Sequence, residues 1–169
     1  SLVNTQFQLQ SGTPSFDLNI ARSFSRLNSV FLVMHGATSA TVRDVNTFIG
    51  MNPEEVNGRL QIGSKQWPDG QNVTGMSQWW LRLISALEVV YSASHNIAIT
   101  RTQYETDSFI AAWDTETTPT ATGTGFNCAK GELLTISMKG LSNSHQRALV
   151  LCHHDVIIEL RDTGCDVLV

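Results

Sequence analysis

The amino-acid sequence predicts an all-β protein, folded as an antiparallel β-sandwich. Short apolar stretches with a two-residue alternation recur along the chain, and turn-forming residues separate them, as is typical of strands joined by loops. One stretch, at about residues 77–92, has the three- and four-residue apolar spacing of an amphipathic helix. Charged residues make up only 15% of the chain, which indicates a neutral surface rich in threonine, serine, glycine and asparagine.

Length and charge narrow the classes of function. We expect the 169 residues to form one domain, 1–169, because a chain of this length can bury a substantial core. The net charge of −4 argues against general nucleic-acid binding by this chain. No stretch is long and apolar enough to span a membrane, and no secretory signal is recognisable. Because the sequence starts at Ser1, we expect either a processed chain or one part, such as one half, of a longer protein.

The first part of the chain contains four predicted strands. They cover residues 5–10, 16–20, 30–34 and 59–63. Residues 38–50 are expected to form a loop that allows a helical turn, and Asn52 is expected to cap a further short turn at 53–55. The sequence Trp67-Pro68-Asp69-Gly70 predicts a tight turn.

The helix predicted at about 77–92 has a bulky apolar stripe. The stripe consists of Trp80, Leu83, Ile84, Leu87, Val90 and Tyr91. We expect this stripe to be buried over the open end or flank of the sandwich. Thr74 or Ser77 is expected to cap the start of the helix. Gln78, Arg82 and Glu88 are expected to face solvent or a partner chain.

The second part of the chain returns to strands. Residues 97–101, 108–114 and 133–138 are predicted strands, with a Thr/Gly-rich loop at 115–125 and a polar turn at 142–146. The last stretch, residues 147–169, predicts one long strand, a tight turn at Asp162-Thr163-Gly164 and a short returning strand. No βα alternation and no internal repeat is present, which favours an antiparallel sandwich.

Asp162-Thr163-Gly164 also matches the active-site triplet of retroviral-type aspartic proteases. That catalysis needs two such aspartates that share one proton, together with a second half of the monomer after the triplet. Only five residues follow Gly164, and Arg161 beside the aspartate favours its charged form. A hairpin turn is therefore the favoured interpretation, with Asp162 in a structural role.

The other polar clusters indicate no chemistry. Cys152-His153-His154-Asp155 resembles a metal site on paper, but on a strand its members alternate between two faces, two ligands to a face. Cys128, Cys152 and Cys165 lack paired spacing and are expected to be buried free thiols. Residues 123–131 lack the spacing of a phosphate loop. We therefore expect no catalytic residues, no metal ion and no cofactor.

Aromatic residues in loops are the candidates for contacts. Trp80 and Trp113 are expected in the core, because they lie on the helix stripe and in a strand. Trp67 and Trp79 are candidates for a contact surface, and Phe126 lies in a second polar loop. The candidate inter-subunit contacts are therefore Trp67, Trp79 and Phe126.

Four segments occur in a recognisable order along most of the chain. They are SFDLNIARSFSRLNSVFLV, LQIGSKQWPDG followed at once by the amphipathic helix, GELLTISMKG, and LVLCHHDVIIELRDTGCDVLV. Together they resemble the C-terminal jelly roll of the double jelly-roll major capsid proteins of virophages and Polinton-like viruses. The resemblance implies an eight-stranded jelly roll and a structural protein that self-assembles, as homotrimers with other capsid proteins, into an icosahedral virion inside the host cell.

Two other hypotheses stay open. A carbohydrate-binding β-sandwich module would use Trp67, Trp79 and the loop at 115–125 as its sugar platform. A degenerate aspartic-protease-like fragment is the third hypothesis. The first hypothesis predicts a protein that assembles, the second a protein that binds glycans.

Overall fold

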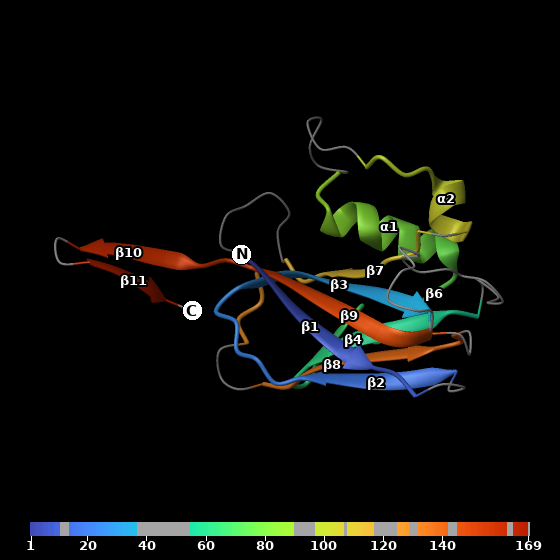
Figure 1. Ribbon diagram of the computed structural model, residues 1–169, viewed down its shortest axis with the longest axis horizontal. Coiled ribbons are helices and arrows are strands. Elements are labelled where there is room, and N and C mark those ends of the chain that lie inside the picture. The colour runs from blue at the N-terminus through green and yellow to red at the C-terminus, as the bar shows by residue number, and fades with distance from the viewer. Residues whose placement is uncertain are drawn as a thin grey trace.

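The computed structural model describes residues 1–10, 14–36, 55–89, 97–106, 108–116, 125–128, 132–141, 145–161 and 164–168. Two antiparallel sheets form its body (Figure 1). One sheet contains, in spatial order, β1 (Leu2–Gln8), β9 (His145–His154), β3 (Leu27–Gly36) and β7 (Ala111–Asp114). The other contains β2 (Ser15–Ile20), β8 (Leu134–Lys139), β4 (Asn57–Ile62) and β5 (Lys65–Trp67), with β6 (Val73–Thr74) paired to β4.

The strand order is that of a jelly roll. The chain passes from one sheet to the other at almost every connection, and it stays in the same sheet between β4 and β6. Each sheet therefore combines strands from both ends of the chain, such as β1 with β9 and β2 with β8. Two interlocked Greek keys of eight strands give this arrangement. The predicted fold class, an antiparallel jelly-roll β-sandwich, is confirmed.

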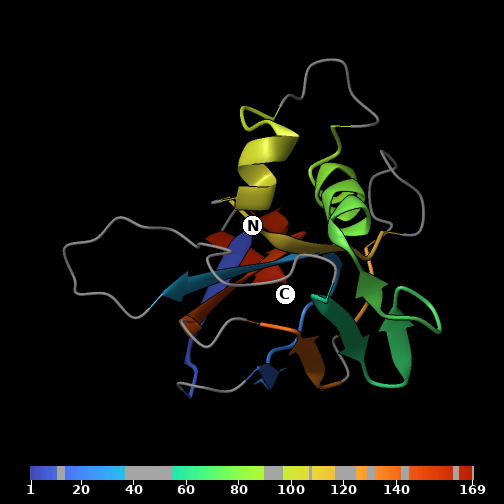
Figure 2. The same cartoon turned by 90° about the vertical axis from the view of Figure 1, so that its right-hand side faces the viewer.

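The core lies between the two sheets because their strands alternate buried and outward residues. β4 buries Gly58, Leu60 and Ile62 and leaves the residues between them half-buried. β8 does the same with Leu134, Ile136 and Met138. The strand β3 is apolar on both faces, since helices cover the outer face of its sheet. Figures 1 and 2 show the resulting three layers, with the helices, the β1-β9-β3-β7 sheet and the second sheet stacked in that order.

Helix α1 (Met76–Ala86) is shorter than predicted and is rotated relative to the predicted stripe. It begins after Gly75, which makes no side-chain cap, so the expected caps at Thr74 and Ser77 are wrong. Its buried residues are Met76, Trp79 and Leu83. Trp80 is half-buried and Leu87 is 39% exposed, which corrects the expected burial of Leu87. The helix ends at Ala86 because Glu88 adopts a left-handed backbone conformation, with φ of 57°.

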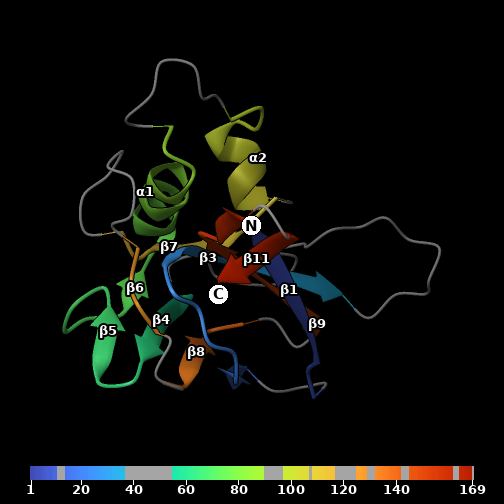
Figure 3. The same ribbon diagram turned by 90° about the vertical axis from the view of Figure 1, so that its left-hand side faces the viewer.

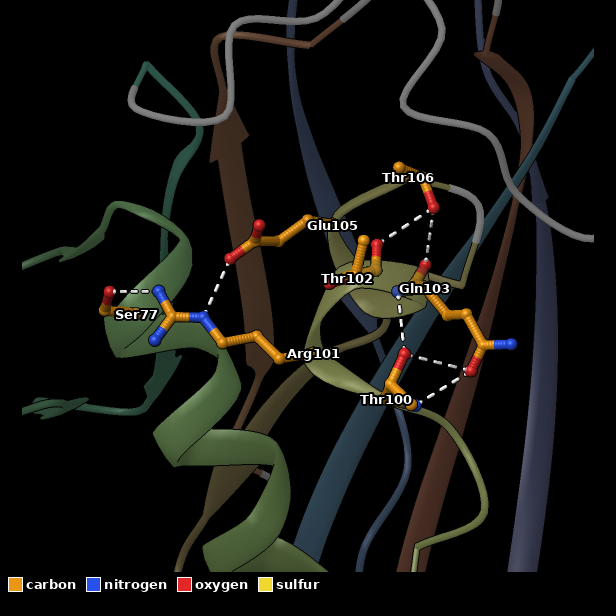
Figure 4. A network of polar contacts seen from close by, with 7 residues as sticks. All are labelled: Ser77, Thr100, Arg101, Thr102, Gln103, Glu105 and Thr106. Atoms are coloured by element: carbon orange, nitrogen blue, oxygen red, sulfur yellow. Dashed lines mark hydrogen bonds and ion pairs between the residues drawn. The ribbon is translucent and has the colours of Figure 1, made fainter.

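A second helix, α2 (Arg101–Thr106), begins at the last residue of the strand predicted at 97–101, and that strand is wrong, since residues 97–100 form none. Its start is a capping box. The Gln103 backbone N–H donates to Thr100 Oγ1 at 3.3 Å, and the Thr100 N–H donates to Gln103 Oε1 at 2.9 Å. Arg101 then links the helices, because it donates to Ser77 Oγ of α1 at 2.7 Å and to Glu105 at 2.8 Å (Figure 4).

The C-terminal stretch is two units and not one long strand. β9 ends at His154, and a separate two-stranded hairpin follows, made of β10 (Ile157–Arg161) and β11 (Gly164–Leu168). The predicted hairpin is confirmed, whereas its continuity with the long strand is wrong. Figure 1 shows the hairpin projecting from the end of the sandwich, and Figure 3 views the molecule from that end. Asp162 and Thr163 lie outside the described residues, as do 37–54, 90–96, 117–124 and 142–144. The expectations for these segments, for Val90 and Tyr91 and for Asp162 therefore stay predictions.

Other predicted strand limits shift by a few residues. β1 begins at Leu2 and not at residue 5, since its pairing with β9 extends to Leu2 and His153. β7 covers only the last part of the predicted strand at 108–114. The predicted turn at 67–70 is present, and Gly70 in it has a φ of 69°.

Candidate functional surfaces

An apolar groove lies between the helices and the outer face of the β1-β9-β3-β7 sheet. On β3, alternation buries Val30, Leu32 and Met34 in the core and turns Phe31 and Val33 to the other face. The register sets Phe31 of β3 directly opposite Leu151 of β9, so the outer face is apolar across neighbouring strands. The sheet therefore contributes a hydrophobic floor.

The walls of this groove come from the helical layer. Its lining consists of Leu2, Phe31, Val33 and Leu151 from the sheet, and of Leu83, Leu87, Ile97, Ile99 and Ile110 from the segments above it. The groove has a volume of about 360 Å³, and none of its lining side chains is polar. Leu2 is 59% exposed and Leu87 is 39% exposed, so the rim is open to solvent. Burial of such a surface against a hydrophobic partner is favourable, because it removes apolar area from water.

A polar pocket of about 180 Å³ lies on the opposite sheet. Its lining consists of Asp17, Asn57, Arg59, Asn72, Ser137 and Lys139. The register places Asp17, Ser137 and Arg59 in one row across β2, β8 and β4. Carboxylate, amide, hydroxyl and cationic groups of this kind can hydrogen-bond the hydroxyls or acidic groups of a small ligand. Neither Trp67 nor Trp79 lines this pocket.

The structure brings two of the three candidate contact residues together. Trp67 and Phe126 meet edge to face, with ring centroids 4.9 Å apart, and both are half-buried. Phe126 is fixed by paired backbone hydrogen bonds with Leu27, each 2.8 Å long. The Lys65 ammonium lies 5.1 Å from the Phe126 ring centre, in the range of a cation–π contact.

The third candidate, Trp79, is a correction. It is fully buried between α1 and the sheets, and its indole N–H donates to the Val56 carbonyl at 3.2 Å. The predicted stripe placed Trp80 and not Trp79 in the core, whereas Leu83 belongs both to this stripe and to the buried face of α1. Trp79 is therefore neither an inter-subunit contact nor part of a sugar platform.

The cluster Cys152-His153-His154-Asp155 spans the end of β9. His154 is buried and its ring packs on Phe24, with centroids 5.1 Å apart, whereas His153 is half-buried. Burial is the main cause that lowers the pKa of His153. Within the described part of the chain, no group of three or more His, Cys, Asp or Glu side chains is placed to hold a metal ion.

Two of the three cysteines are buried free thiols, as expected. They are Cys128 and Cys152. Burial raises the pKa of the Cys152 thiol to about 12, the nearby Cys128 adds to this rise, and Arg22 opposes it. Both thiols therefore stay protonated near neutral pH, a state that is a poor nucleophile and a poor metal ligand.

Asp114, at the end of β7, is expected to make stability depend on pH. Burial is the largest cause that raises its pKa; Glu88 raises it further, while the hydrogen bond from the Glu116 N–H and the charge of Arg82 lower it. A carboxyl group whose pKa is higher in the folded protein binds its proton more tightly there. Its contribution to stability is therefore full below the ordinary pKa and is lost as pH rises through the folded pKa.

The variant Asp114→Asn is expected to be more stable than the wild type at pH 7, by less than about 1 kcal/mol because the side chain is half-buried. The asparagine oxygen can still accept the Glu116 N–H, which lies 2.9 Å from Asp114 Oδ1. Urea unfolding between pH 3 and 7 measures the difference, which should close at low pH. Asp17→Asn, which removes a carboxylate at an exposed position of β2, is the matched control. An Asp114→Asn advantage that persists unchanged at pH 3 would contradict this prediction.

No family model matches this sequence, and no curated protein is significantly similar to it. Neither described helix is long and apolar enough to cross a bilayer. Among the described residues, the candidate surfaces are the apolar groove beside the helices and the polar pocket on the opposite sheet.

Proposed function

We propose that this chain is a structural capsid protein, which works by self-association into the capsomers of an icosahedral viral shell. The observation that carries the proposal is the strand order, β1-β9-β3-β7 facing β2-β8-β4-β5. This eight-stranded jelly roll is an architecture of viral capsid and lectin domains. The four sequence segments that resemble double jelly-roll capsid proteins coincide with its strands and with the start of α1. Fold alone does not assign function, so the surfaces must support the choice.

The surfaces favour assembly. The apolar groove and the exposed Leu2 and Leu87 on its rim are suited to burial against another protein surface. The small net charge allows copies to pack closely without strong like-charge repulsion. Among the described residues, the thiols are buried and no metal-binding cluster is present, so these groups favour no catalytic role. We further propose homotrimers as the capsomer, with other capsid proteins as partners and the virion as location.

A carbohydrate-binding module is the second candidate, and the polar pocket is the observation that favours it. Asp17, Asn57 and Arg59 with their neighbours offer several hydrogen-bonding groups in one concave site. The original form of this hypothesis is weakened, because Trp79 is buried and cannot stack on a sugar. A binding module need not assemble, whereas a shell protein must.

The test of the proposed function is the mass of the protein in solution. Sedimentation velocity from about 1 to 100 μM, a range that brackets ordinary weak association, should show trimers and larger assemblies that grow with concentration. Electron microscopy should then show shells or capsomers. A protein that stays monomeric throughout would contradict the capsid proposal. Glycan titration of Asp17→Ala beside the wild type would then test the binding module, with loss of glycan binding as its expected result.

A further inference from the structure

The C-terminal hairpin forms a small sheet of its own, apart from the two main sheets. We define the C-terminal arm as β10 and β11, residues 157–161 and 164–168. The two strands pair with each other in five register pairs and join neither main sheet. A two-stranded hairpin by itself is only marginally stable in water, so a partner surface would stabilise it. Its sequence is rich in isoleucine, leucine and valine, and the Ile158 side chain is 58% exposed.

The base of the arm is fixed in direction. Asp155, the first residue after β9, donates its backbone N–H to the Arg26 carbonyl at 3.0 Å, and its carboxylate accepts from Asn28 Nδ2 at 3.0 Å. The preceding residue, His154, donates its N–H to the Ser1 carbonyl at 2.9 Å. These bonds hold the chain to the sandwich just before it leaves. The arm therefore projects from the body, as Figure 1 shows, instead of lying on it.

The same chain has an apolar groove that is suited to the exposed Ile158 side chain of this arm. The lining of the groove contains no charged or polar side chain, so it accepts an apolar residue and excludes the charged Glu159 and Arg161, which alternate with Ile158 and Leu160 along β10. Leu2 on the groove rim pairs with His153, four residues before the arm begins. The base of the arm and the rim of the groove are thus neighbours on every copy, and each copy offers one arm and one groove.

We infer that the C-terminal arm of one copy lies, with Ile158 inward, in the apolar groove of a neighbouring copy. This inference rests on the proposed function, since it names the contact by which the chains associate. A contact that joins one surface to a different surface is head-to-tail, and such contacts close into rings when the rotation allows. A ring of three would make the trimer, with every arm and every groove occupied.

Two matched pairs of variants test the inference. Ile158→Asp puts a charge on the arm, and its control is Leu81→Asp, at an equally exposed position (58% and 56%) on α1 outside the groove. Leu87→Asp puts a charge on the groove rim, and its control is Leu133→Asp, which is 46% exposed and also outside the groove. Sedimentation velocity should show association weakened at least about tenfold by Ile158→Asp and Leu87→Asp, equivalent to about 1.4 kcal/mol. Both controls should assemble as the wild type does. Circular dichroism melting checks that each variant is folded.

Crosslinking identifies the partner surface directly. Ile158→Cys and Leu87→Cys are made separately in a Cys165→Ser background, leaving only the buried native thiols Cys128 and Cys152. A short bismaleimide should join the two variants only when they are mixed, giving a product of two chains with one of each. A chain with both substitutions that crosslinks only to itself would overturn the inference, because the arm would then occupy its own groove.

The failures of the two proposals are distinguishable. If the wild type assembles and the Ile158→Asp and Leu87→Asp variants assemble equally well, the arm inference is wrong while the shell proposal stands. If the wild type is monomeric at every concentration, the shell proposal is wrong, and the arm exchange is wrong with it. Crosslinking between the mixed Ile158→Cys and Leu87→Cys variants, together with loss of assembly in the corresponding Asp variants, would support both proposals.

Discussion

Trp79→Ala is expected to lower the free energy of unfolding by about 3–5 kcal/mol, which is enough to leave much of the protein unfolded at 37 °C. Trp79 is fully buried and meets Phe109 and Trp113 edge to face, with ring centroids 5.7 and 5.4 Å apart. Truncation would remove these contacts, leave a cavity the size of an indole and leave the Val56 carbonyl without its 3.2 Å donor. Urea unfolding followed by circular dichroism measures the loss.

Trp80→Ala is the matched control, because the same truncation occurs one residue later on the same helix. Trp80 is half-buried and packs against Tyr104, with centroids 5.1 Å apart. Its truncation should lower the free energy of unfolding by less than half as much, since solvent already reaches the ring. A larger loss at Trp80 than at Trp79 would support the predicted stripe, and equal losses would show that Trp79 is not the main anchor. Trp79→Phe, which keeps ring packing but removes the N–H, should fall between the two.

Trp79 also explains how α1 is attached. Its ring contacts Trp113 of β7 in one sheet, and its N–H bonds the residue that precedes β4 of the other. One side chain therefore ties the helix to both sheets at the edge of the sandwich. Any loss of this anchor should release α1, and with α1 one wall of the apolar groove, to which Leu83 and Leu87 contribute.

The strands whose alternation buries one face were predictable from sequence. β2 and β8 show this best, since each alternates inward and outward residues along its length. Alternation is a local pattern, and a slip by one residue would expose the whole apolar set, so the sequence specifies it strongly. The order of the strands was not readable from such patterns. The structure supplies it as β1-β9-β3-β7 and β2-β8-β4-β5.

The segment before α2 differs from the strand that its residue pattern predicts. Ile97 and Ile99 alternate with polar residues, which favoured a strand. In the structure both side chains line the groove from a non-helical segment, and the helix starts directly after Thr100. The signal that could have found it is the spacing of Thr100 and Gln103, a capping box. The position of Trp80 depends on this unpredicted helix, because Trp80 packs on the Tyr104 ring that α2 supplies.

The groove itself could not be predicted, because its lining comes from segments far apart in the chain. Leu2 and Leu151 become neighbours only through the pairing of β1 with β9, and the helices bring Leu87 to the same place. The break between β9 and the C-terminal arm could not be predicted from the sequence either. An apolar run has the same pattern inside a sheet or in a free hairpin, and the difference lies in the long-range hydrogen bonds at Asp155.

Gly140→Ala is expected to have the second large effect, lowering the free energy of unfolding by about 3 kcal/mol or more. Gly140 follows β8 and has a φ of 75°, a conformation that is unfavourable for alanine. A Cβ there would overlap the Glu55 carbonyl oxygen and lie 2.6 Å from its carbon. These are backbone atoms and cannot rotate aside, so the strands must move. Thermal melting and urea unfolding measure the loss.

Gly70→Ala separates the two causes, because Gly70 also has a positive φ, 69°, but a Cβ there would meet no atom within 4 Å. The free energy of unfolding that Gly70→Ala loses should reflect backbone strain alone, about 1 kcal/mol. The excess at Gly140 then measures the steric overlap with Glu55, two residues before β4. Since Asn57 of β4 pairs with Lys139 of β8, relief of that overlap would have to shift the β4–β8 pairing beside the polar pocket. Equal losses at Gly70 and Gly140 would mean that the chain around Glu55 yields without disturbing this pairing.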